Sequence, residues 1–192
     1  MPLTAGLLLT GGASRRMGRP KATIEWRGER LADRAARVLQ AVCAPVFEVG
    51  PGYSAVPTVD EDEPGAGPLA ALHAGFRALD DADAGERAAV LLACDLPFVG
   101  VETVRLLADW PGDGTVVPVA DAHPQVLCAR YGADARLAVP RLLADGRRSL
   151  RALVDAIEPV LLDEADWRVA GGHRSFVDLD TPADLERWSG EE

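Results

Sequence analysis

The chain has 192 residues, 48% of them hydrophobic, which is enough for one compact domain with its own core. Its 30 acidic and 20 basic residues give a net charge of −10, which disfavours binding to nucleic acid or to an anionic membrane surface. No apolar stretch approaches the roughly 18 residues that span a bilayer, and the start lacks the pattern of a signal peptide. We therefore expect a cytoplasmic protein with no nucleic acid and no membrane among its partners.

The numbers of cysteines and lysines bear on which residues could form a functional site. Cys43, Cys94 and Cys128 are odd in number and lack metal-ligand spacing, so we interpret them as small, mostly buried apolar residues. Of the 20 basic residues 19 are arginine, and Lys21 is the one lysine. A chain that otherwise uses arginine has kept a single ammonium group, which directs attention to the surroundings of Lys21.

The apolar pattern predicts alternating strands and helices. An apolar run at 5–10 ends in Gly11 and Gly12, as a buried strand that closes into a glycine-rich turn would. Further strands are expected at 46–49, 56–59, 88–94, 115–119, 125–130, 159–162 and 176–179. Helices are expected at 30–43, 69–79, 101–109, 134–144 and 149–155 and from Pro182 onward. This order, without repeats or linkers, predicts an α/β fold with a doubly wound, mainly parallel sheet in a single domain, 1–192.

The loop after the first strand has the composition of a phosphate cradle. Residues 11–21 read GGASRRMGRPK, so glycines allow backbone N–H groups to approach an anion while Arg16 and Lys21 add positive charge. The loop is neither a Walker A motif nor the Gly-x-Gly-x-x-Gly turn of a dinucleotide-binding oxidoreductase. The alternative is a glycine turn with solvated arginines. Under that interpretation, the position of the loop at a strand end and the presence of the one lysine in it are coincidental.

Carboxylates at two further places are candidate metal ligands. Asp95 directly follows the strand expected at 88–94, on the sheet edge that also carries the glycine loop. Mg²⁺ is commonly held there by one or two carboxylates and by phosphate oxygens. Asp178 and Asp180 come from a third segment, and Asp180 could complete the metal site. The structural alternatives are a turn role for Asp95 and a helix-capping role for Asp180 or the adjacent Thr181.

At this point the motifs match a known family. The segment LLLTGGASRRMGRPKA at 7–22 resembles the N-terminal signature of the molybdenum cofactor guanylyltransferases. The likeness continues in GPLAALHAGF at 67–76, LLACDLPF at 91–98, HPQVLCARY at 123–131, GRRSLRALV at 146–154 and FVDLDTPADLERW at 176–188. The resemblance implies a Rossmann-like nucleotidyltransferase that joins the GMP part of GTP to molybdopterin carrying molybdenum. Such an enzyme releases pyrophosphate and requires Mg²⁺.

The resemblance also implies roles for individual residues. It places Lys21, Arg16 and Asp95 in catalysis, and Asp95 with Asp180 on the metal. The implied nucleotide-binding residues are Leu9, Thr10, Gly11, Gly12, Ser14, Arg16, Lys21, Asp60, Gly67 and Asp95. The implied acceptor-binding residues are His123, Pro124, Arg147 and Arg148. On this basis a part at about 1–110 binds the nucleotide and a part at about 111–192 binds the acceptor. Proteins that deliver the cofactor or mature molybdoenzymes are the implied protein partners.

Pro20 departs from the family pattern, which has an aspartate before the lysine. Cytidylyl and sugar-phosphate nucleotidyltransferases share the loop and vary around it, so they remain an alternative, as does a non-catalytic nucleotide-binding relative. The chain length and the segments at 67–76 and 176–188 favour the guanylyltransferases. Cys94, His73 and His173 are interpreted as packing or loop residues outside the chemistry.

Overall fold

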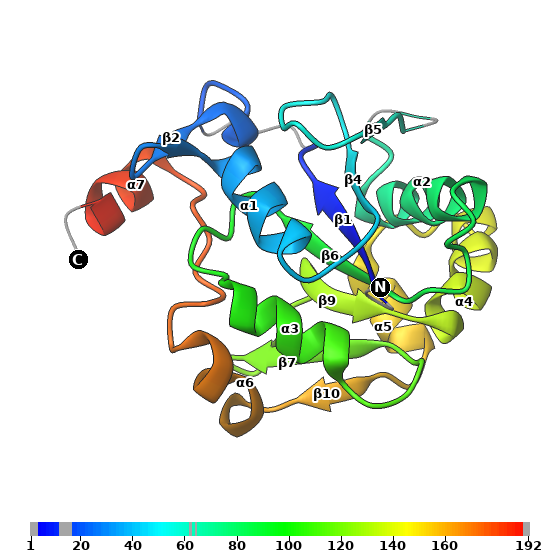
Figure 1. The fold of residues 1–192 in the computed structure, drawn as a ribbon. Coiled ribbons are helices and arrows are strands. Elements are labelled where there is room, and N and C mark those ends of the chain that lie inside the picture. Colours follow the sequence, from blue (N-terminus) through cyan, green and yellow to red (C-terminus); the bar gives the residue numbers. More distant parts are fainter. Residues whose placement is uncertain (1–3, 12–16, 62, 64, 190–192) are drawn as a thin grey trace.

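The computed structural model describes residues 4–11, 17–61, 63 and 65–189 (Figure 1). The strands are β1 (Ala5–Leu9), β2 (Glu25–Trp26), β3 (Glu29–Arg30), β4 (Val46–Val49), β5 (Thr58–Val59), β6 (Ala89–Ala93), β7 (Val116–Ala120), β8 (His123–Pro124), β9 (Cys128–Tyr131) and β10 (Val160–Leu162). The helices are the 3₁₀-helix η1 (Lys21–Thr23) and α1 (Leu31–Gln40), α2 (Pro68–Asp81), α3 (Val101–Asp109), α4 (Ala133–Ala144), α5 (Leu150–Ala156), α6 (Glu164–Gly171) and α7 (Pro182–Ser189). The predicted alternation of strands and helices is confirmed.

One mainly parallel sheet carries the fold. Its strand order is β10-β7-β9-β6-β1-β4-β5, with β8 paired to β7. The strands β6, β1, β4 and β5 form consecutive parallel pairs, and β10 pairs in parallel with β7. Strand β9 runs antiparallel to both β6 and β7, so β6 and β7 point the same way and their carboxyl ends share an edge. Ligands of open α/β sheets bind at that edge.

Helices cover both faces of the sheet, as the doubly wound fold class requires (Figure 1). Leu8 of β1 packs in the layer of α1, α3 and α6, whereas Leu7 and Leu9 pack in the layer of α2, α4 and α5. Successive side chains of a strand point to opposite faces, so the run of apolar residues in β1 serves both layers. Strand β6 is likewise buried along its whole length.

Local signals fix several helix starts. Helix α2 begins with Pro68 after Gly67, whose φ of 102° suits glycine. Helix α5 is capped by the Ser149 hydroxyl, which accepts a hydrogen bond from the Ala152 N–H at 3.1 Å. A capping box of Asp163 and Asp166 starts α6.

One expectation about strands is wrong, and one pair of strands was not predicted. The segment 176–179, predicted to be a strand, forms no strand in the structure. Its backbone has one hydrogen bond to a strand end, from the Leu179 N–H to the Asp95 carbonyl at 2.9 Å, and a single bond is not a ladder. The short antiparallel pair of β2 and β3 was not predicted, because strands of two residues carry no periodic signal.

Candidate functional site

Three residues that lie far apart in the sequence meet at the carboxyl edge of the sheet. Lys21 opens η1, Asp95 follows β6, and Asp180 precedes α7. The Lys21 ammonium donates a hydrogen bond to Oδ2 of Asp95 at 2.9 Å and another to Oδ1 of Asp180. The side chains of Lys21 and Asp95 are 15% and 20% exposed, and that of Asp180 is 44% exposed. The unique lysine therefore joins the two predicted metal ligands into one cluster, which faces solvent on the Asp180 side.

Local structure holds the Asp180 end of this cluster in place. Oδ2 of Asp184 accepts hydrogen bonds from the N–H groups of Asp180 and Thr181 at 3.1 and 2.7 Å, and from the Thr181 hydroxyl at 2.8 Å. These bonds lower the pKa of Asp184 below its ordinary value, led by the bond from the Thr181 hydroxyl. The carboxylate that starts α7 thus orders the turn that presents Asp180 to Lys21.

Electrostatics keep the cluster charged. Partial burial opposes the charge of Lys21, but its hydrogen bonds and the negative charges of Asp180 and Asp95 outweigh burial and raise the lysine pKa. Partial desolvation, followed by repulsion from Asp180 and Asp95, raises the pKa of Asp178 above that of an ordinary aspartate. The two carboxylates that bind the Lys21 ammonium leave an excess of negative charge, which suits a divalent cation.

Asp95 has a free coordination position suited to such a cation. Its Oδ1 atom is buried and has no hydrogen-bond partner among the residues that the structure describes. Buried polar atoms are normally paired, so an unpaired carboxylate oxygen marks a place for a ligand or a water. No cluster of three or more potential metal ligands exists in the described part of the chain. This arrangement fits Mg²⁺, which binds through one or two carboxylates and completes its shell with water and phosphate oxygens.

The other predicted nucleotide-binding residues follow the same sheet edge. Leu9 ends β1, and Thr10 and Gly11 come directly after it. Asp60 follows β5 and is exposed, and Gly67 precedes α2. Gly12, Ser14 and Arg16 lie outside the described residues.

The predicted acceptor-binding residues lie at two separate places. His123 and Pro124 form β8, which pairs with the carboxyl end of β7, and the exposed His123 ring is 2.6 Å from the Asp121 carbonyl through Nδ1. Arg147 and Arg148 are exposed in the loop between α4 and α5.

The loop of Arg147 and Arg148 contacts the start of α2. The Arg148 carbonyl accepts a hydrogen bond from the Leu69 N–H at 3.2 Å. A Cβ on Gly67 would lie 2.7 Å from that same carbonyl, so only glycine allows this approach. The residues implied for the acceptor thus touch a residue implied for the nucleotide.

A buried acid at this edge was missed by sequence reasoning. Glu48 of β4 is 0% exposed, and its carboxylate is surrounded by donors from Thr10 and from residues 52–54. The signal available in the sequence is an acidic residue inside the apolar strand Val46-Phe47-Glu48-Val49. Such a residue either faces solvent or has specific buried partners.

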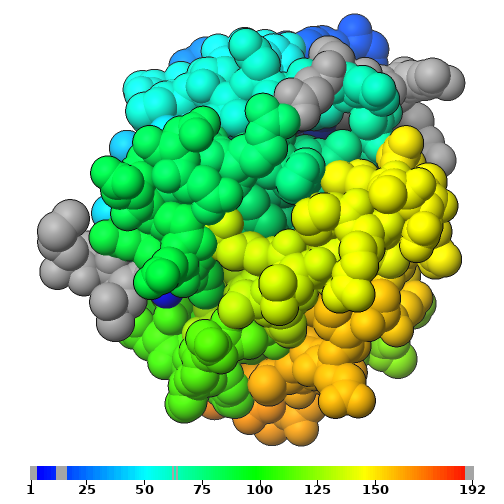
Figure 2. All heavy atoms as spheres, turned by 90° about the vertical axis from the view of Figure 1, so that its right-hand side faces the viewer, coloured from blue at the N-terminus to red at the C-terminus, as the bar shows by residue number. Residues whose placement is uncertain are grey.

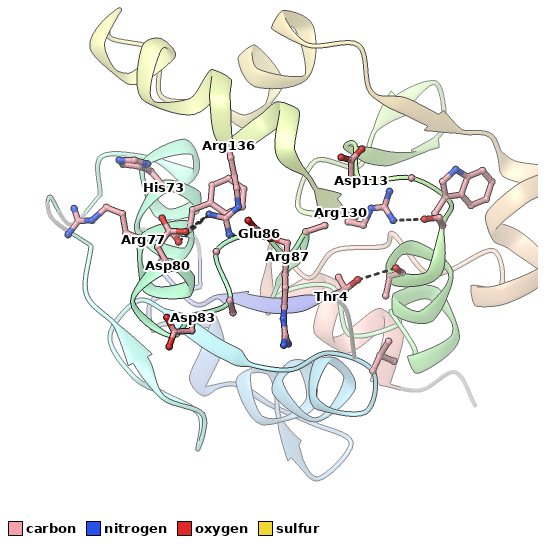
Figure 3. Close-up of a pocket in the computed structure, with 18 of the residues that line it drawn as sticks. Thr4, His73, Arg77, Asp80, Asp83, Glu86, Arg87, Asp113, Arg130 and Arg136 are labelled. Carbon is pink, nitrogen blue, oxygen red and sulfur yellow. Dashed lines mark hydrogen bonds and ion pairs between the residues drawn. The ribbon is translucent and has the colours of Figure 1, made fainter. Parts of the chain in front are cut away.

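A hollow of about 1460 Å³ opens at the opposite, amino-terminal edge of the sheet (Figure 3). Residues of α2 and α4, which lie next to each other on one face of the molecule (Figure 2), contribute to its lining. Its cations hold the fold together. Arg130 donates to the carbonyls of Trp110 and Gly114, and Arg136 donates to Asp80 at 2.9 Å. We interpret this hollow as a structural junction.

Comparison with known proteins gives consistent matches along the chain. Residues 6–160 match the sequence model of the MobA-like NTP transferase domain. A Mycobacterium bovis protein named probable molybdenum cofactor guanylyltransferase is 37% identical over 187 residues, which span 93% of this chain and 92% of that protein. A protein of the same name from Opitutus terrae is 38% identical over 185 residues, which span 88% and 90%.

Solved structures share the fold. Molybdopterin-guanine dinucleotide biosynthesis protein A from Archaeoglobus fulgidus superposes with a TM-score of 0.80 at 22% identity, covering 96% of both chains. A nucleotidyl transferase from Methanothermobacter superposes with a TM-score of 0.71 at 20% identity, covering 97% of this chain and 95% of its own. Among the described residues, no helix has the length and apolarity needed to cross a membrane.

Proposed function

The chain belongs to the MobA-like NTP transferase family, and we propose that it transfers the GMP part of GTP to molybdopterin that carries molybdenum. The observation that carries this proposal is the cluster of Lys21, Asp95 and Asp180, with its unpaired Asp95 oxygen, at the sheet edge after β1 and β6. Such an edge binds nucleotides in α/β folds.

The reaction joins two anions. A phosphate oxygen of the acceptor forms a bond to the α-phosphorus of GTP, and the bond from that phosphorus to the bridging oxygen of the β-phosphate breaks. Pyrophosphate leaves with the electron pair, so no protein nucleophile is required. We assign to Lys21 the role of reducing the repulsion between the two anions and of stabilising negative charge on the leaving group.

Asp95 and Asp180 are the residues we assign to Mg²⁺. When bound, Mg²⁺ would neutralise phosphate charge and orient the triphosphate. Asp95 offers its free Oδ1 for this purpose, while its Oδ2 keeps Lys21 in position. Asp180 holds Lys21 from the other side.

The remaining assignments follow the sheet edge. We assign the backbone of Leu9, Thr10 and Gly11, with Gly12, Ser14 and Arg16, to the triphosphate. We assign Asp60 and Gly67 to the nucleoside side. His123 and Pro124, with Arg147 and Arg148, are assigned to the pterin phosphate side of the acceptor. The substrates of this reaction are GTP and a cofactor intermediate, so we propose that the protein acts in the cytoplasm. We propose cofactor-delivering and molybdoenzyme-maturation proteins as its partners.

The test supplies purified protein with Mg²⁺, molybdenum-loaded molybdopterin and each of the four nucleoside triphosphates in turn. We expect a guanine dinucleotide product by mass spectrometry and one pyrophosphate per product, with GTP alone. A cytosine product at a comparable rate would identify a cytidylyl enzyme, the alternative raised by Pro20. Binding of GTP without any product would identify a non-catalytic relative.

A further inference from the structure

Glu48 carries an unusual set of hydrogen bonds for a carboxylate in a strand. Its Oε1 accepts from the Thr10 hydroxyl at 2.5 Å and from the N–H groups of Gly52 and Tyr53 at 3.0 and 2.7 Å. Its Oε2 accepts from the N–H and the hydroxyl of Ser54 at 2.7 and 2.6 Å. Five donors from two segments of the chain therefore converge on one fully buried side chain.

In the described part of the chain, the partners of the Glu48 carboxylate are neutral hydrogen-bond donors. No lysine or arginine of the described residues forms an ion pair with Glu48. Burial by itself would raise the pKa of Glu48, but hydrogen bonds from Ser54, Thr10 and Tyr53 outweigh burial and lower the pKa below its ordinary value. A buried charge without a counter-ion persists only where donors surround it, so the donors and the acid depend on each other.

The two segments that Glu48 joins both lie at the nucleotide edge. Thr10 is the first residue after β1, and the Thr10 N–H also donates to the Val49 carbonyl at 3.3 Å. On the other side, Gly50 has a φ of 143°, and a Cβ there would lie 2.5 Å from Oγ1 of Thr10 and 2.9 Å from the Gly11 nitrogen. The loop after β4 thus packs against the backbone where the glycine loop begins.

We propose that Glu48 is a positioning residue for the nucleotide, holding Thr10 and Gly11 of the glycine loop against the loop 50–54. The inference rests on the proposed function, because it assigns Glu48 to the site where that function places GTP. Glu48 does not touch the nucleotide, since both of its oxygens are occupied by protein donors. It acts through the N–H groups and the hydroxyl that it fixes, so its loss weakens nucleotide binding more than turnover of bound substrate.

The test measures GTP binding by calorimetry with Mg²⁺ and turnover with the acceptor, in four variants. Glu48→Gln keeps the shape but has one acceptor oxygen, so its amide group must face donors. Thr10→Val removes only the hydroxyl that links Glu48 to the glycine loop, and Thr10→Ser restores it. Asp134→Asn is the matched control: the Asp134 carboxylate also accepts from a threonine hydroxyl and from backbone N–H groups, of Thr115 and Ala135, but at the opposite edge of the sheet.

We expect Glu48→Gln to raise the dissociation constant for GTP about tenfold and Thr10→Val to raise it about fivefold, the size expected for lost charge-assisted bonds. Thr10→Ser should recover most of the affinity that Thr10→Val loses, and Asp134→Asn should stay within about twofold of the parent even if it lowers the melting temperature. In Glu48→Gln and Thr10→Val the dissociation constant for GTP should change more than kcat does.

Other results would overturn the inference or the proposed function. Unchanged GTP affinity in folded Glu48→Gln would overturn the inference, as would an equal loss in Asp134→Asn, which would mean that lowered stability alone weakens binding. If Glu48→Gln does not fold, Thr10→Val decides, and parental affinity there overturns the inference. A parent protein that binds none of the four nucleoside triphosphates would instead overturn the proposed function, and this inference with it.

Discussion

The two edges of the central sheet use buried charge in opposite ways. At the amino-terminal edge, all three guanidinium nitrogens of Arg130 donate to the carbonyls of Trp110 and Gly114, at 2.6 to 3.2 Å. At the carboxyl edge, one oxygen of Asp95 accepts a hydrogen bond from Lys21. The other oxygen is buried and has no partner among the described residues. Both groups are costly to bury, yet only one is satisfied by the protein itself.

This difference is the basis for interpreting Arg130 as a structural group and Asp95 as a ligand-binding group. Arg130 is 2% exposed and connects β9 to the loop before β7, so it stabilises the fold. Asp95 and Lys21 form a cluster in which one buried carboxylate oxygen, Oδ1 of Asp95, has no partner among the described residues. The hollow beside Arg130 is large, and both Arg130 and the Arg136–Asp80 pair in its lining bond to the protein, although Nε of Arg136 has no partner among the described residues. At the carboxyl edge the atom without such a partner is a carboxylate oxygen, which can bind a cation. Size alone therefore does not identify the site.

The largest expected effect on activity comes from removing the Asp95 carboxylate. Asp95→Ala should lower the rate of GMP transfer by about a thousandfold, because the main metal ligand and one partner of Lys21 are lost together. The melting temperature should change little, since the side chain ends a strand and contributes more to the site than to the core. Parallel measurement of turnover and thermal unfolding checks both statements. Full Mg²⁺-dependent activity in this variant would remove Asp95 from the site.

A smaller loss is expected at Lys21. Lys21→Ala should lower kcat/KM by about a hundredfold, and Lys21→Arg should recover part of it, because a planar guanidinium cannot take the compact position between Asp95 and Asp180. Arg105→Ala on α3, where the arginine pairs with Glu102 on the surface, is the control and should match the parent. Steady-state kinetics on the three variants decide the point. If Lys21→Arg performed like the parent, the argument from the unique lysine would fail.

The meeting of Lys21 and Asp95 at one sheet edge was predictable, because Gly11 and Asp95 follow apolar runs that had to be buried strands and Lys21 belongs to the segment after the first of them. The carboxyl ends of such strands share an edge. The family was also predicted from its motifs, and the match over residues 6–160 confirms it. Local sequence was sufficient wherever one strand and its following loop determined the outcome.

Other features depend on contacts that no local pattern encodes. In the sequence, Glu48 is indistinguishable from an ordinary strand residue. Its role depends on hydrogen bonds from the loop 50–54, which is not part of the strand pattern. The segment 176–179 has the composition of a strand, but only Leu179 bonds to a strand end, at Asp95. The antiparallel course of β9 within a mainly parallel sheet is likewise set by its neighbours, and an apolar run fits either direction.

At the amino-terminal edge of the sheet, we expect a substitution to lower stability while leaving activity nearly unchanged. Arg130→Met should lower the free energy of unfolding by about 3 kcal/mol, because buried carbonyls of Trp110 and Gly114 lose their donors. Turnover measured well below the melting temperature should stay within about twofold of the parent, since the fold still presents the carboxyl edge. Chemical denaturation and initial rates provide the two measurements. A selective loss of activity at full stability would contradict the structural role.

The smallest effect is expected on the acceptor side, at Arg147 and Arg148. Both are exposed, and the Arg148 guanidinium already donates to the carbonyls of Leu143 and Arg147 at 3.1 Å, so less of its charge is available to a ligand. We expect the double change to alanine to raise KM for the pterin substrate about fivefold, with most of the effect from Arg147, because an exposed cation contributes little binding energy.

The affinity for GTP distinguishes this role from a general disturbance of the site. Arg148 contacts the start of α2 through its backbone carbonyl, which remains in the alanine variant, so Gly67 and Leu69 keep their neighbour. GTP affinity measured by calorimetry should therefore stay within about twofold, since a lost contact to one substrate removes only that substrate's binding energy. Arg141→Ala, at an exposed position of α4, should change neither constant. An equal loss of affinity for GTP in the double variant would place the two arginines in the nucleotide half of the site.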